Sequence, residues 1–291
     1  MIYKKELLEE YSKTKLDSTV KTTEEDEKFA VPSNDGILCS IIIPVYGNEN
    51  FTRAAIDDLL RLPSCYEIII VDNFTISSLR SDTNALTTYD VFIDAFDKRT
   101  ENQAKLEYIG CPKNLGFGRG NNKGYKHASG EYILFLNSDI RVQDRHEDWP
   151  SIMLEWAERG FLVGTQGGLL DKGFNFVKEG TGLEQTDHWY VSGWCLCGSK
   201  ENFDKLILDY YAHDETDEIM EGKAWGPWNE KFFAYFEDGD LTWRARDLGI
   251  EFKEVTVPVH HFGRMTGRKL NISHLYKKSQ RIFKKIWKDK R

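Results

Sequence analysis

Two acidic clusters in this sequence could do chemistry, because each lies beside a segment that should hold it rigidly. The first is Asn137-Ser138-Asp139, which directly follows the uncharged run Tyr132 to Leu136. Such a run predicts a strand buried on both faces. Ligands bind beyond the carboxyl ends of strands in open α/β sheets, so Asp139 is placed to hold a divalent cation against a phosphate. The alternative is a plain turn, which these residue types also favour.

The second cluster is Glu237-Asp238-Gly-Asp240, at the start of a helix predicted for residues 241–248. A helix N-terminus stabilises negative charge, so we expect these carboxylates to stay ionised at neutral pH. A general base must be ionised, and Asp238 is the candidate. In the alternative, structural interpretation, Asp240 caps the helix and pairs with Arg244 four residues later. That interpretation leaves Glu237 and Asp238 without a role.

Adjacent histidines, His260 and His261, follow a strand predicted at residues 251–257. Neutral imidazole binds Mn²⁺ readily, so either ring could complete a metal site with Asp139. Neighbouring side chains on an extended chain point to opposite sides, so only one of the two can be the ligand. A purely structural role is the alternative for both.

The elements that must position these residues follow the order strand, helix, strand. Strands are predicted at residues 37–44 and 66–71, with a helical pattern at 51–62 between them. This βαβ unit predicts a parallel sheet. Asp72 ends the second strand, so we expect it in the same crevice as the loop at Pro44, where its carboxylate could bind a ribose or base edge. A helix N-cap is the alternative role for Asp72.

A glycine-rich segment, residues 114–124, lies between a short strand predicted at 106–109 and a helix running through His127. The dinucleotide-binding pattern fits poorly, because Asn121 stands where its third glycine should be. The segment instead offers backbone N–H groups and Asn side chains at a helix start, which suit contact with an anion or a sugar. We expect Gly130 to cap this helix before the buried strand begins.

Composition and charge exclude several classes of protein. The chain has 291 residues, 40% of them apolar, so it can bury a sizeable core. It has no run of about 18 apolar residues and no apolar leader, so we expect a cytoplasmic protein. The five cysteines are scattered without a Cys-x-x-Cys pair, which predicts neither a disulfide framework nor a zinc ribbon. The net charge of −15 outside residues 270–291 argues against nucleic-acid binding.

The end of the chain differs from this acidic body, because residues 270–291 carry a net charge of +7. Apolar residues recur at helical spacing from Ile272 to Lys290 with lysines between them, which predicts a basic amphipathic helix. Such a helix could make a peripheral contact with an anionic membrane surface, or it could pack its apolar face on its own domain. At the other end, residues 1–36 are charged, predict a helix followed by a linker, and show no chemistry.

Several segments, in this order, resemble glycosyltransferase family 2, particularly its rhamnosyltransferase-like members. They are Pro44-Val-Tyr46, Val71-Asp-Asn73, the glycine-rich segment, the stretch at 130–139, and a counterpart of the family's ED motif at 233–241. The resemblance covers roughly residues 38 to 265. The family's DXD metal motif has Asp where this chain has Asn137, a variation that the rhamnosyltransferase-like branch shares. Asp139 must therefore do most of the coordination.

The resemblance implies an α/β fold of the GT-A type, with a mainly parallel, Rossmann-like central sheet flanked by helices. We expect a transferase domain at residues 37–267, with a nucleotide-sugar half at 37–140 and an acceptor half at 141–267. An N-terminal extension (1–36) and the basic C-terminal helix (268–291) would flank it. An acidic insertion at residues 209–226 has no counterpart that we can assign.

The function implied is inverting transfer of a hexose or deoxyhexose from a UDP-, dTDP- or GDP-linked donor to a hydroxyl of a glycan or glycolipid, with Mn²⁺ or Mg²⁺ as cofactor. Such a reaction belongs to polysaccharide biosynthesis. Two alternatives remain: a nucleotidylyltransferase, which should show a glycine-rich basic loop after the first strand, and a sugar-binding module without catalysis.

The resemblance also assigns roles to residues. Asp238 and Glu237 would be catalytic, and Gly193 and Trp194, in a strand expected at 189–197, would contact the acceptor. Asp139 would bind the metal together with His260, which we prefer to His261 by likeness to the family's Val-x-His pattern. The basic residues Arg264, Arg268 and Lys269 could neutralise the departing diphosphate. The donor would contact Pro44, Val45, Tyr46, Asp72, Asn73, Asn114, Gly116, Gly120, Asn121, Asn137, Ser138 and Asp139.

Overall fold

The structure is a computed structural model that describes residues 36–73, 86–143, 148–181, 185–213, 216–263 and 272–290. The chain divides into two units, Met1–Pro32 and Ser33–Arg291, and the described residues all belong to the second. The extension expected at residues 1–36 therefore lies, apart from Gly36, outside the described residues. So do Arg264, Arg268 and Lys269.

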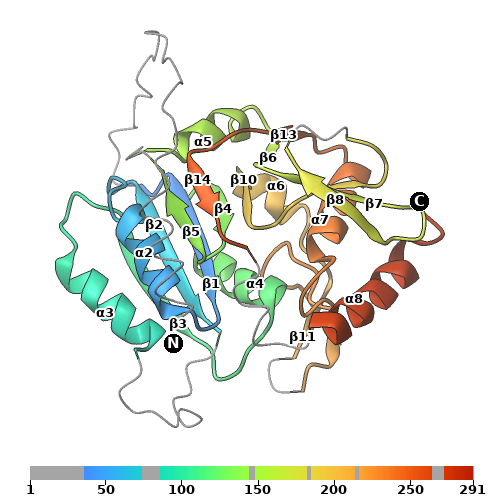
Figure 1. Cartoon of the computed structure of the whole chain (residues 1–291), viewed down its shortest axis with the longest axis horizontal. Helices are drawn as coiled ribbons and strands as arrows, with labels where there is room; N and C mark the ends of the chain where they lie inside the picture. The colour runs from blue at the N-terminus through green and yellow to red at the C-terminus, as the bar shows by residue number, and fades with distance from the viewer. Residues whose placement is uncertain are drawn as a thin grey trace. The chain divides into compact units, whose positions relative to one another are not determined.

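A seven-stranded sheet forms the centre of the second unit (Figure 1). Its strand order is β13-β6-β10-β4-β1-β2-β3. Every neighbouring pair is parallel except those of β10, which runs antiparallel to both β4 and β6. The predicted mainly parallel α/β sheet is confirmed. The strands are β1 Cys39–Val45, β2 Tyr66–Asp72, β3 Lys105–Gly110, β4 Tyr132–Leu136, β6 Leu162–Gly164, β10 Cys195–Ser199 and β13 Phe252–Glu254.

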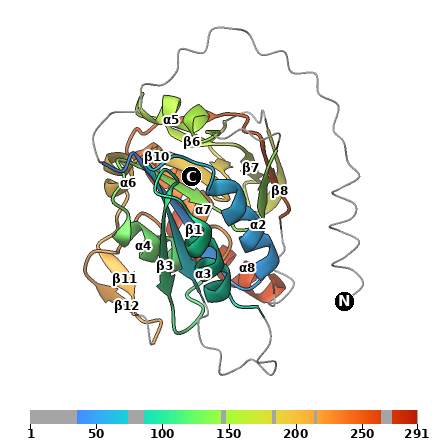
Figure 2. The same ribbon diagram turned by 90° about the vertical axis from the view of Figure 1, so that its left-hand side faces the viewer.

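Helices cover both faces of this sheet, which explains why its central strands are apolar without alternation. Within β1, Ile41 and Ile43 belong to the core beneath α2 and α3, whereas Ile42 belongs to the core beneath α4. Figure 2 shows α2 and α3 on one side and α4 on the other. The described helices are α2 Glu49–Leu59, α3 Thr88–Lys98, α4 Phe117–His127, α5 Ser151–Ala157, α6 Lys200–Asp204, α7 Glu237–Asp247 and α8 Ile272–Trp287.

Three smaller sheets surround the central one. The first is the pair β5 and β14, and the second has three strands in the order β8-β7-β9. The third, a hairpin of β11 and β12, occupies most of the unassigned insertion and is tied to α4 through Asp217, which pairs with Arg119 and Lys113. The strands are β5 Ile140–Val142, β14 Val259–His261, β7 Gly167–Leu170, β8 Phe176–Gly180, β9 Trp189–Val191, β11 Tyr210–Ala212 and β12 Ile219–Glu221.

Two local predictions were wrong. The strand expected at residues 189–197 is two strands in different sheets, with a turn at Gly193-Trp194 between them. The helix cap expected at Gly130 is absent, because α4 ends at Ala128 with an extended backbone. All five cysteines are free, and all but Cys65 are buried.

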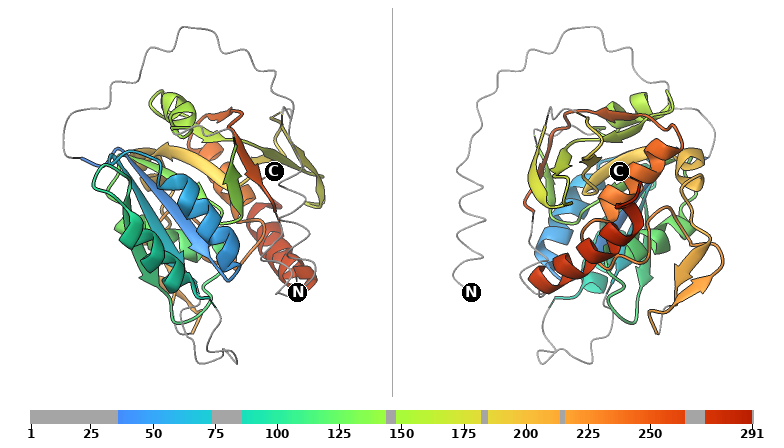
Figure 3. Two further views of the ribbon diagram at one scale, coloured as in Figure 1. Left: turned by 60° about the vertical axis from the view of Figure 1, so that its left-hand side comes forward. Right: turned by 90° about the vertical axis from the view of Figure 1, so that its right-hand side faces the viewer.

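The amphipathic helix α8 packs its apolar face on its own domain. Phe283 and Trp287 join a buried cluster with Phe236 and Trp243, and Figure 3 shows α8 beside α7. Insertion of this apolar face into a membrane is thus ruled out as α8 is folded here. Among the described residues, no helix combines the length and the apolar character that crossing a membrane requires.

Candidate active site

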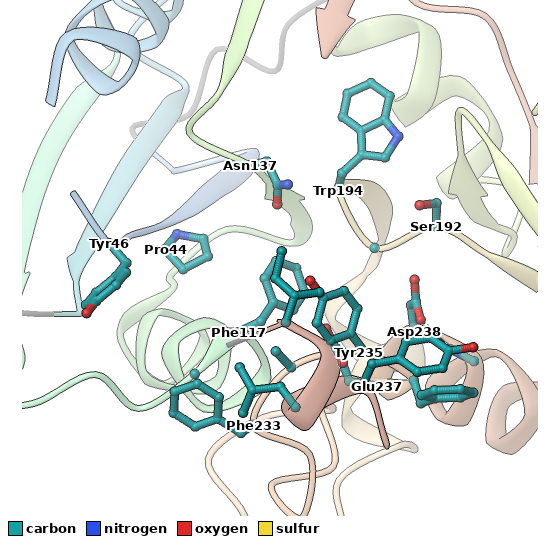
Figure 4. Close-up of a pocket in the computed structure, with 18 of the residues that line it drawn as sticks. Pro44, Tyr46, Phe117, Asn137, Ser192, Trp194, Phe233, Tyr235, Glu237 and Asp238 are labelled. Carbon is teal, nitrogen blue, oxygen red and sulfur yellow. Dashed lines mark hydrogen bonds between the residues drawn. The ribbon is translucent and has the colours of Figure 1, made fainter. Parts of the chain in front are cut away.

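A cavity of about 750 Å³ opens beyond the carboxyl ends of β1 and β4. One side, which we call the strand-end wall, consists of residues 44–46, Asn73, Asn114, Gly116, 137–139 and His261. The opposite side, the helix wall, consists of Glu179, residues 190 and 192–193, residues 235–238 and Tyr276. In Figure 4, Pro44, Tyr46 and Asn137 lie across the cavity from Ser192, Glu237 and Asp238.

The strand-end wall is held by asparagines around one glycine. Asn73 Nδ2 donates to the carbonyl of Gly116 at 3.0 Å, and Asn114 Oδ1 accepts from the N–H of Gly116 at 2.9 Å. Gly116 has φ +84°, and a Cβ there would lie 2.2 Å from the Phe233 carbonyl oxygen, so only glycine fits. The buried Oδ1 of Asn73 finds no hydrogen-bond partner among the described residues.

Three residues predicted to contact the donor do not line the cavity. Asp72 is buried and accepts a hydrogen bond from the Tyr108 hydroxyl at 2.8 Å, because β3 lies beside β2 with its tyrosine close to that carboxylate. Gly120 packs against the Asn73 side chain, and Asn121 is wholly buried inside α4. The positions predicted at Pro44, Val45, Tyr46, Asn73, Asn114, Gly116, Asn137, Ser138 and Asp139 do line it.

The structure places His261, and not the preferred His260, in the cavity wall. β14 pairs with β5 so that His261 lies opposite Ile140, next to Asp139, and enters the cavity wall. Nε2 of His261 lies 3.2 Å from Asp139 Oδ1, and its ring stacks on Trp194 with centroids 4.5 Å apart. His260 points the other way, is exposed, and packs against Phe262.

Asp139 and His261 form a donor pair that suits a divalent cation. Nδ2 of Asn137 lies 3.1 Å from the same Nε2. In the tautomer that leaves Nε2 without a hydrogen, this nitrogen has one lone pair, which would bind a cation shared with Asp139 in place of the Asn137 amide. Among the described residues no three His, Cys, Asp or Glu side chains converge on a metal site. Two protein donors are nevertheless enough for Mg²⁺ or Mn²⁺ when phosphate oxygens and water complete the shell.

Across the cavity, Glu237 and Asp238 begin α7 after a strained turn. Tyr235 and Phe236 both have φ +69°, a left-handed conformation that costs non-glycine residues roughly 1–2 kcal/mol each. The cluster on α8 holds this turn, since Tyr276 packs on both aromatic rings. Strain held in this way is a feature of functional sites.

Asp240, by contrast, is structural: it pairs with Arg244 as the alternative interpretation predicted, but it does not cap α7, whose N-cap is Phe236. It is fully buried, pairs with Arg244 at 2.8 Å, and accepts hydrogen bonds from Asn229 and from Nε1 of Trp287. One carboxylate thereby joins α7 to the C-terminal helix.

The prediction that Glu237 and Asp238 stay ionised like ordinary helix-start carboxylates was wrong. Burial raises the pKa of Asp238, and the negative charge of Glu179 raises it further, while N–H groups of Gly239 and Gly193 lower it. Burial and then the charge of Asp238 raise the pKa of Glu237. Desolvation outweighs the helix N-terminus here. A carboxylate with a pKa closer to neutrality is a stronger base once it is deprotonated, and so accepts the proton of an acceptor hydroxyl more readily.

Gly193 and Trp194 lie where they were expected, in the cavity wall, but with different contacts. Gly193 lies against Asp238, whose Cβ would be 3.4 Å from a Cβ at Gly193, whereas Trp194 stacks on His261 and donates through Nε1 to Gln166. Four further wall residues escaped the sequence analysis: Glu179, Tyr190, Ser192 and Tyr276. The aromatic spacing around 190 and 276 was the only signal for any of them.

Comparison with known proteins agrees with this geometry. Residues 40–181 match the sequence profile of Glycosyl transferase family 2. An uncharacterised glycosyltransferase of Rickettsia conorii is 30% identical over 125 residues, 43% of this chain and 18% of that protein. A poly(ribitol-phosphate) beta-glucosyltransferase of Bacillus spizizenii is 34% identical over 103 residues, 34% of this chain and 14% of that protein. The chain thus spans less than a fifth of the length of these curated relatives.

Among solved structures, the chain resembles a mannosyltransferase of Pyrobaculum calidifontis in complex with GDP-Man and Mn²⁺. The TM-score is 0.51 at 13% identity, over 77% of this chain and 56% of that one. This likeness and the sheet topology establish the GT-A fold. Within that fold, the similarity to Glycosyl transferase family 2 lies in residues 40–181.

Proposed function

We propose that this protein is a metal-dependent, inverting glycosyltransferase that moves a sugar from a nucleotide diphosphate to a hydroxyl group. The observation that carries the proposal is the placement of Asp238 and the pair Asp139 and His261 on opposite walls of one cavity. A donor diphosphate at one wall and a base at the other leave the sugar between them.

The strand-end wall would bind the donor. Residues 44–46 and Asn73, which line the cavity, would hold the nucleoside, and the N–H groups and amides near Gly116 suit a diphosphate or sugar. Asp139 and His261 would hold Mn²⁺ or Mg²⁺, which when bound stabilises the charge that develops on the departing diphosphate. UDP-, dTDP- and GDP-linked sugars all fit this description, and the neighbour with GDP-Man and Mn²⁺ supports a nucleotide sugar with a metal.

The helix wall would bind the acceptor, a glycan or glycolipid, and supply the base. Asp238 takes the proton of the acceptor hydroxyl while that oxygen forms a bond to the anomeric carbon. The bond from that carbon to the diphosphate breaks, and its electron pair leaves with the nucleotide. Because base and leaving group lie on opposite sides of the cavity, the acceptor attacks from the face opposite the leaving group, and the configuration inverts.

The deciding experiment combines binding with turnover. Calorimetric titration of UDP, dTDP, GDP and CDP, each with Mn²⁺ and with EDTA, should give metal-dependent binding of one diphosphate. The matching UDP-glucose, UDP-N-acetylglucosamine, dTDP-rhamnose or GDP-mannose is then assayed for transfer and for hydrolysis. dTDP-rhamnose tests the resemblance to the rhamnosyltransferase-like branch.

Asp238→Asn is the critical variant. It should lower turnover about 10²- to 10⁴-fold, the range for general-base catalysis, and leave nucleotide affinity unchanged. Asp187→Asn, an exposed position outside the cavity wall, is the matched control. Undiminished turnover in Asp238→Asn would refute the base assignment. Binding without turnover in the wild type would favour a sugar-binding module, and no binding at all would remove the donor-site assignment.

A further inference from the structure

We propose that Glu179 is an acceptor-binding residue, and that with Asp238 it selects acceptors carrying two neighbouring hydroxyl groups. This inference rests on the proposed function, because it uses Asp238 as the base. Its new content is a second carboxylate on a different element, and a defined class of acceptor, a neutral vicinal diol.

The chain holds the two carboxylates through consecutive residues. Ser192 Oγ donates to Glu179 Oε1 at 2.5 Å, and the next residue, Gly193, lies against Asp238, since a Cβ at Gly193 would be 3.4 Å from the Cβ of Asp238. Consecutive Cα atoms lie about 3.8 Å apart, so the two carboxylates contact neighbouring residues of the chain. Ser192 is only 7% exposed, so its hydroxyl is a fixed donor rather than a surface group.

The three-stranded sheet aims Glu179 at the cavity. Glu179 and Tyr190 both pair with Gly168 of the central strand β7, one from each side, so their side chains point to the same face of that sheet. A Cβ on Gly168 would lie 2.2 Å from Cζ of Tyr190, so the absence of a side chain at Gly168 lets the tyrosine ring lie across β7. Glu179 is exposed, and Ser192 occupies only one of its two oxygens in the described structure. The second oxygen can accept a hydrogen bond from a ligand.

An acceptor with two adjacent hydroxyls matches this arrangement. Asp238 takes the proton of the reacting hydroxyl, and Glu179 accepts a hydrogen bond from the hydroxyl on the next carbon. Glu179 lies at this end of the cavity, and Asp238 becomes charged when it acts as the base, so a phosphate or carboxylate directly beside the reacting hydroxyl is disfavoured. Tyr190 and Tyr276 supply apolar surface for the carbon skeleton.

The same placement couples Glu179 to the base. The titratable groups that face Asp238 are Glu179 from β8, Tyr190 from β9, Tyr276 from α8 and Glu237 from its own helix. Of these, Glu179 is the largest charged contributor to the raised pKa of Asp238. Removing its charge should therefore lower that pKa and make the base available at lower pH.

The experiment uses the full chain, the donor found by titration, and two matched acceptor probes, 1,2-propanediol and 1-propanol. Wild type should prefer the diol. Glu179→Gln should raise KM for 1,2-propanediol about 10- to 100-fold, the effect of a hydrogen bond to a charged group, and leave KM for 1-propanol and for the donor unchanged. Ser192→Ala should act in the same direction more weakly. Glu221→Gln, an exposed residue of β12 outside the cavity wall, is the control.

A second readout is the pH profile of donor hydrolysis without acceptor. Glu179→Gln should move the acidic limb to lower pH, which a merely structural role would not do. If the wild-type enzyme transfers sugar to 1,2-propanediol and to 1-propanol equally well, the diol assignment is overturned. An active Glu179→Gln with unchanged diol KM and an unchanged acidic limb overturns the role of Glu179. Complete inactivity of the wild type would instead overturn the proposed function.

Discussion

The strand-end wall is built from the ends of neighbouring parallel strands, whereas the helix wall is assembled from a separate three-stranded sheet, α7 and α8. The first wall therefore depends on the hydrophobic core of the central sheet, which contains buried residues of β1, β2 and β4. The second depends on the aromatic cluster of α8 and on one buried carboxylate, Asp240. We infer that the two walls can be disabled separately, and the predictions below test that separation.

Asp139→Ala should have the largest effect, and only on the strand-end wall. Side chains that merely support a metal ligand cost about 10- to 100-fold in metal affinity, so loss of a direct ligand should weaken Mn²⁺-dependent nucleotide binding by at least about 100-fold. Affinity in Mn²⁺ should fall to the wild-type value in EDTA. Calorimetric titration measures both. Unchanged affinity in Mn²⁺ would contradict the metal role of Asp139.

Trp287→Phe should affect the helix wall alone. It removes the indole N–H that donates to buried Asp240 at 3.0 Å, a hydrogen bond to a charge, so the free energy of unfolding should fall by about 1.5–3 kcal/mol. Loosening α8 should also slow transfer while nucleotide affinity stays the same. Urea denaturation measures the loss of stability, and calorimetry measures nucleotide affinity. The control is Trp225→Phe, because the Trp225 ring makes its described cation–π contacts with Lys123 and Lys126. Equal losses in both functions would contradict the independence of the walls.

The two walls also differ in how far sequence reasoning reached. Residues 44–46 and 137–139 directly follow apolar runs, so strand periodicity alone placed them. Glu179 and Ser192 meet only through the pairing of β8, β7 and β9, and β8 is almost wholly exposed, so no buried pattern marked it. The position of Asp72 outside the cavity wall has the same origin, since Tyr108 reaches that carboxylate only because β3 pairs with β2. Long-range register, which local patterns do not encode, separates the predicted residues that line the cavity from those that do not.

The adjacent histidines give a sharper version of this point, because register alone distinguishes them. His261→Ala should weaken Mn²⁺-dependent nucleotide binding about tenfold, less than Asp139→Ala, because it removes the neutral donor of the pair and leaves the charged carboxylate in place. His260→Ala, one residue away and exposed, should leave it unchanged. Titration of both variants at one Mn²⁺ concentration decides the matter. A larger loss in His260→Ala would restore the original preference and contradict the pairing of β14 with β5.

The pH dependence of kcat/KM and of stability should reflect the two buried carboxylates of the helix wall, Asp238 and Glu237. Because burial raises the pKa of Asp238, kcat/KM should rise with pH along an acidic limb centred above the ordinary aspartate value of about 3.9. The raised pKa of buried Glu237 also affects folding, because the folded state holds a proton that the unfolded state releases. Its contribution to stability is therefore present below the ordinary carboxyl pKa and is lost as pH rises through the raised one. Urea denaturation should show this loss in the wild type and a smaller one in Glu237→Gln.

The smallest effect concerns the outer face of α8, the one place where membrane contact remains open. Lys277, Lys278, Arg281 and Lys285 are exposed, and no carboxylate of the described residues lies within ion-pair distance of them. Because the apolar face is buried, only the attraction between these basic side chains and anionic lipids could hold α8 at a membrane, at about 1 kcal/mol per basic residue near the surface. We expect weak sedimentation with vesicles of phosphatidylserine and phosphatidylcholine that disappears at high salt, and none with phosphatidylcholine alone. Replacing the four residues by Gln should abolish it without changing hydrolysis of the donor, because the wall residues of α8 lie on its other face. Binding that survives either treatment would mean that another part of the chain makes the contact.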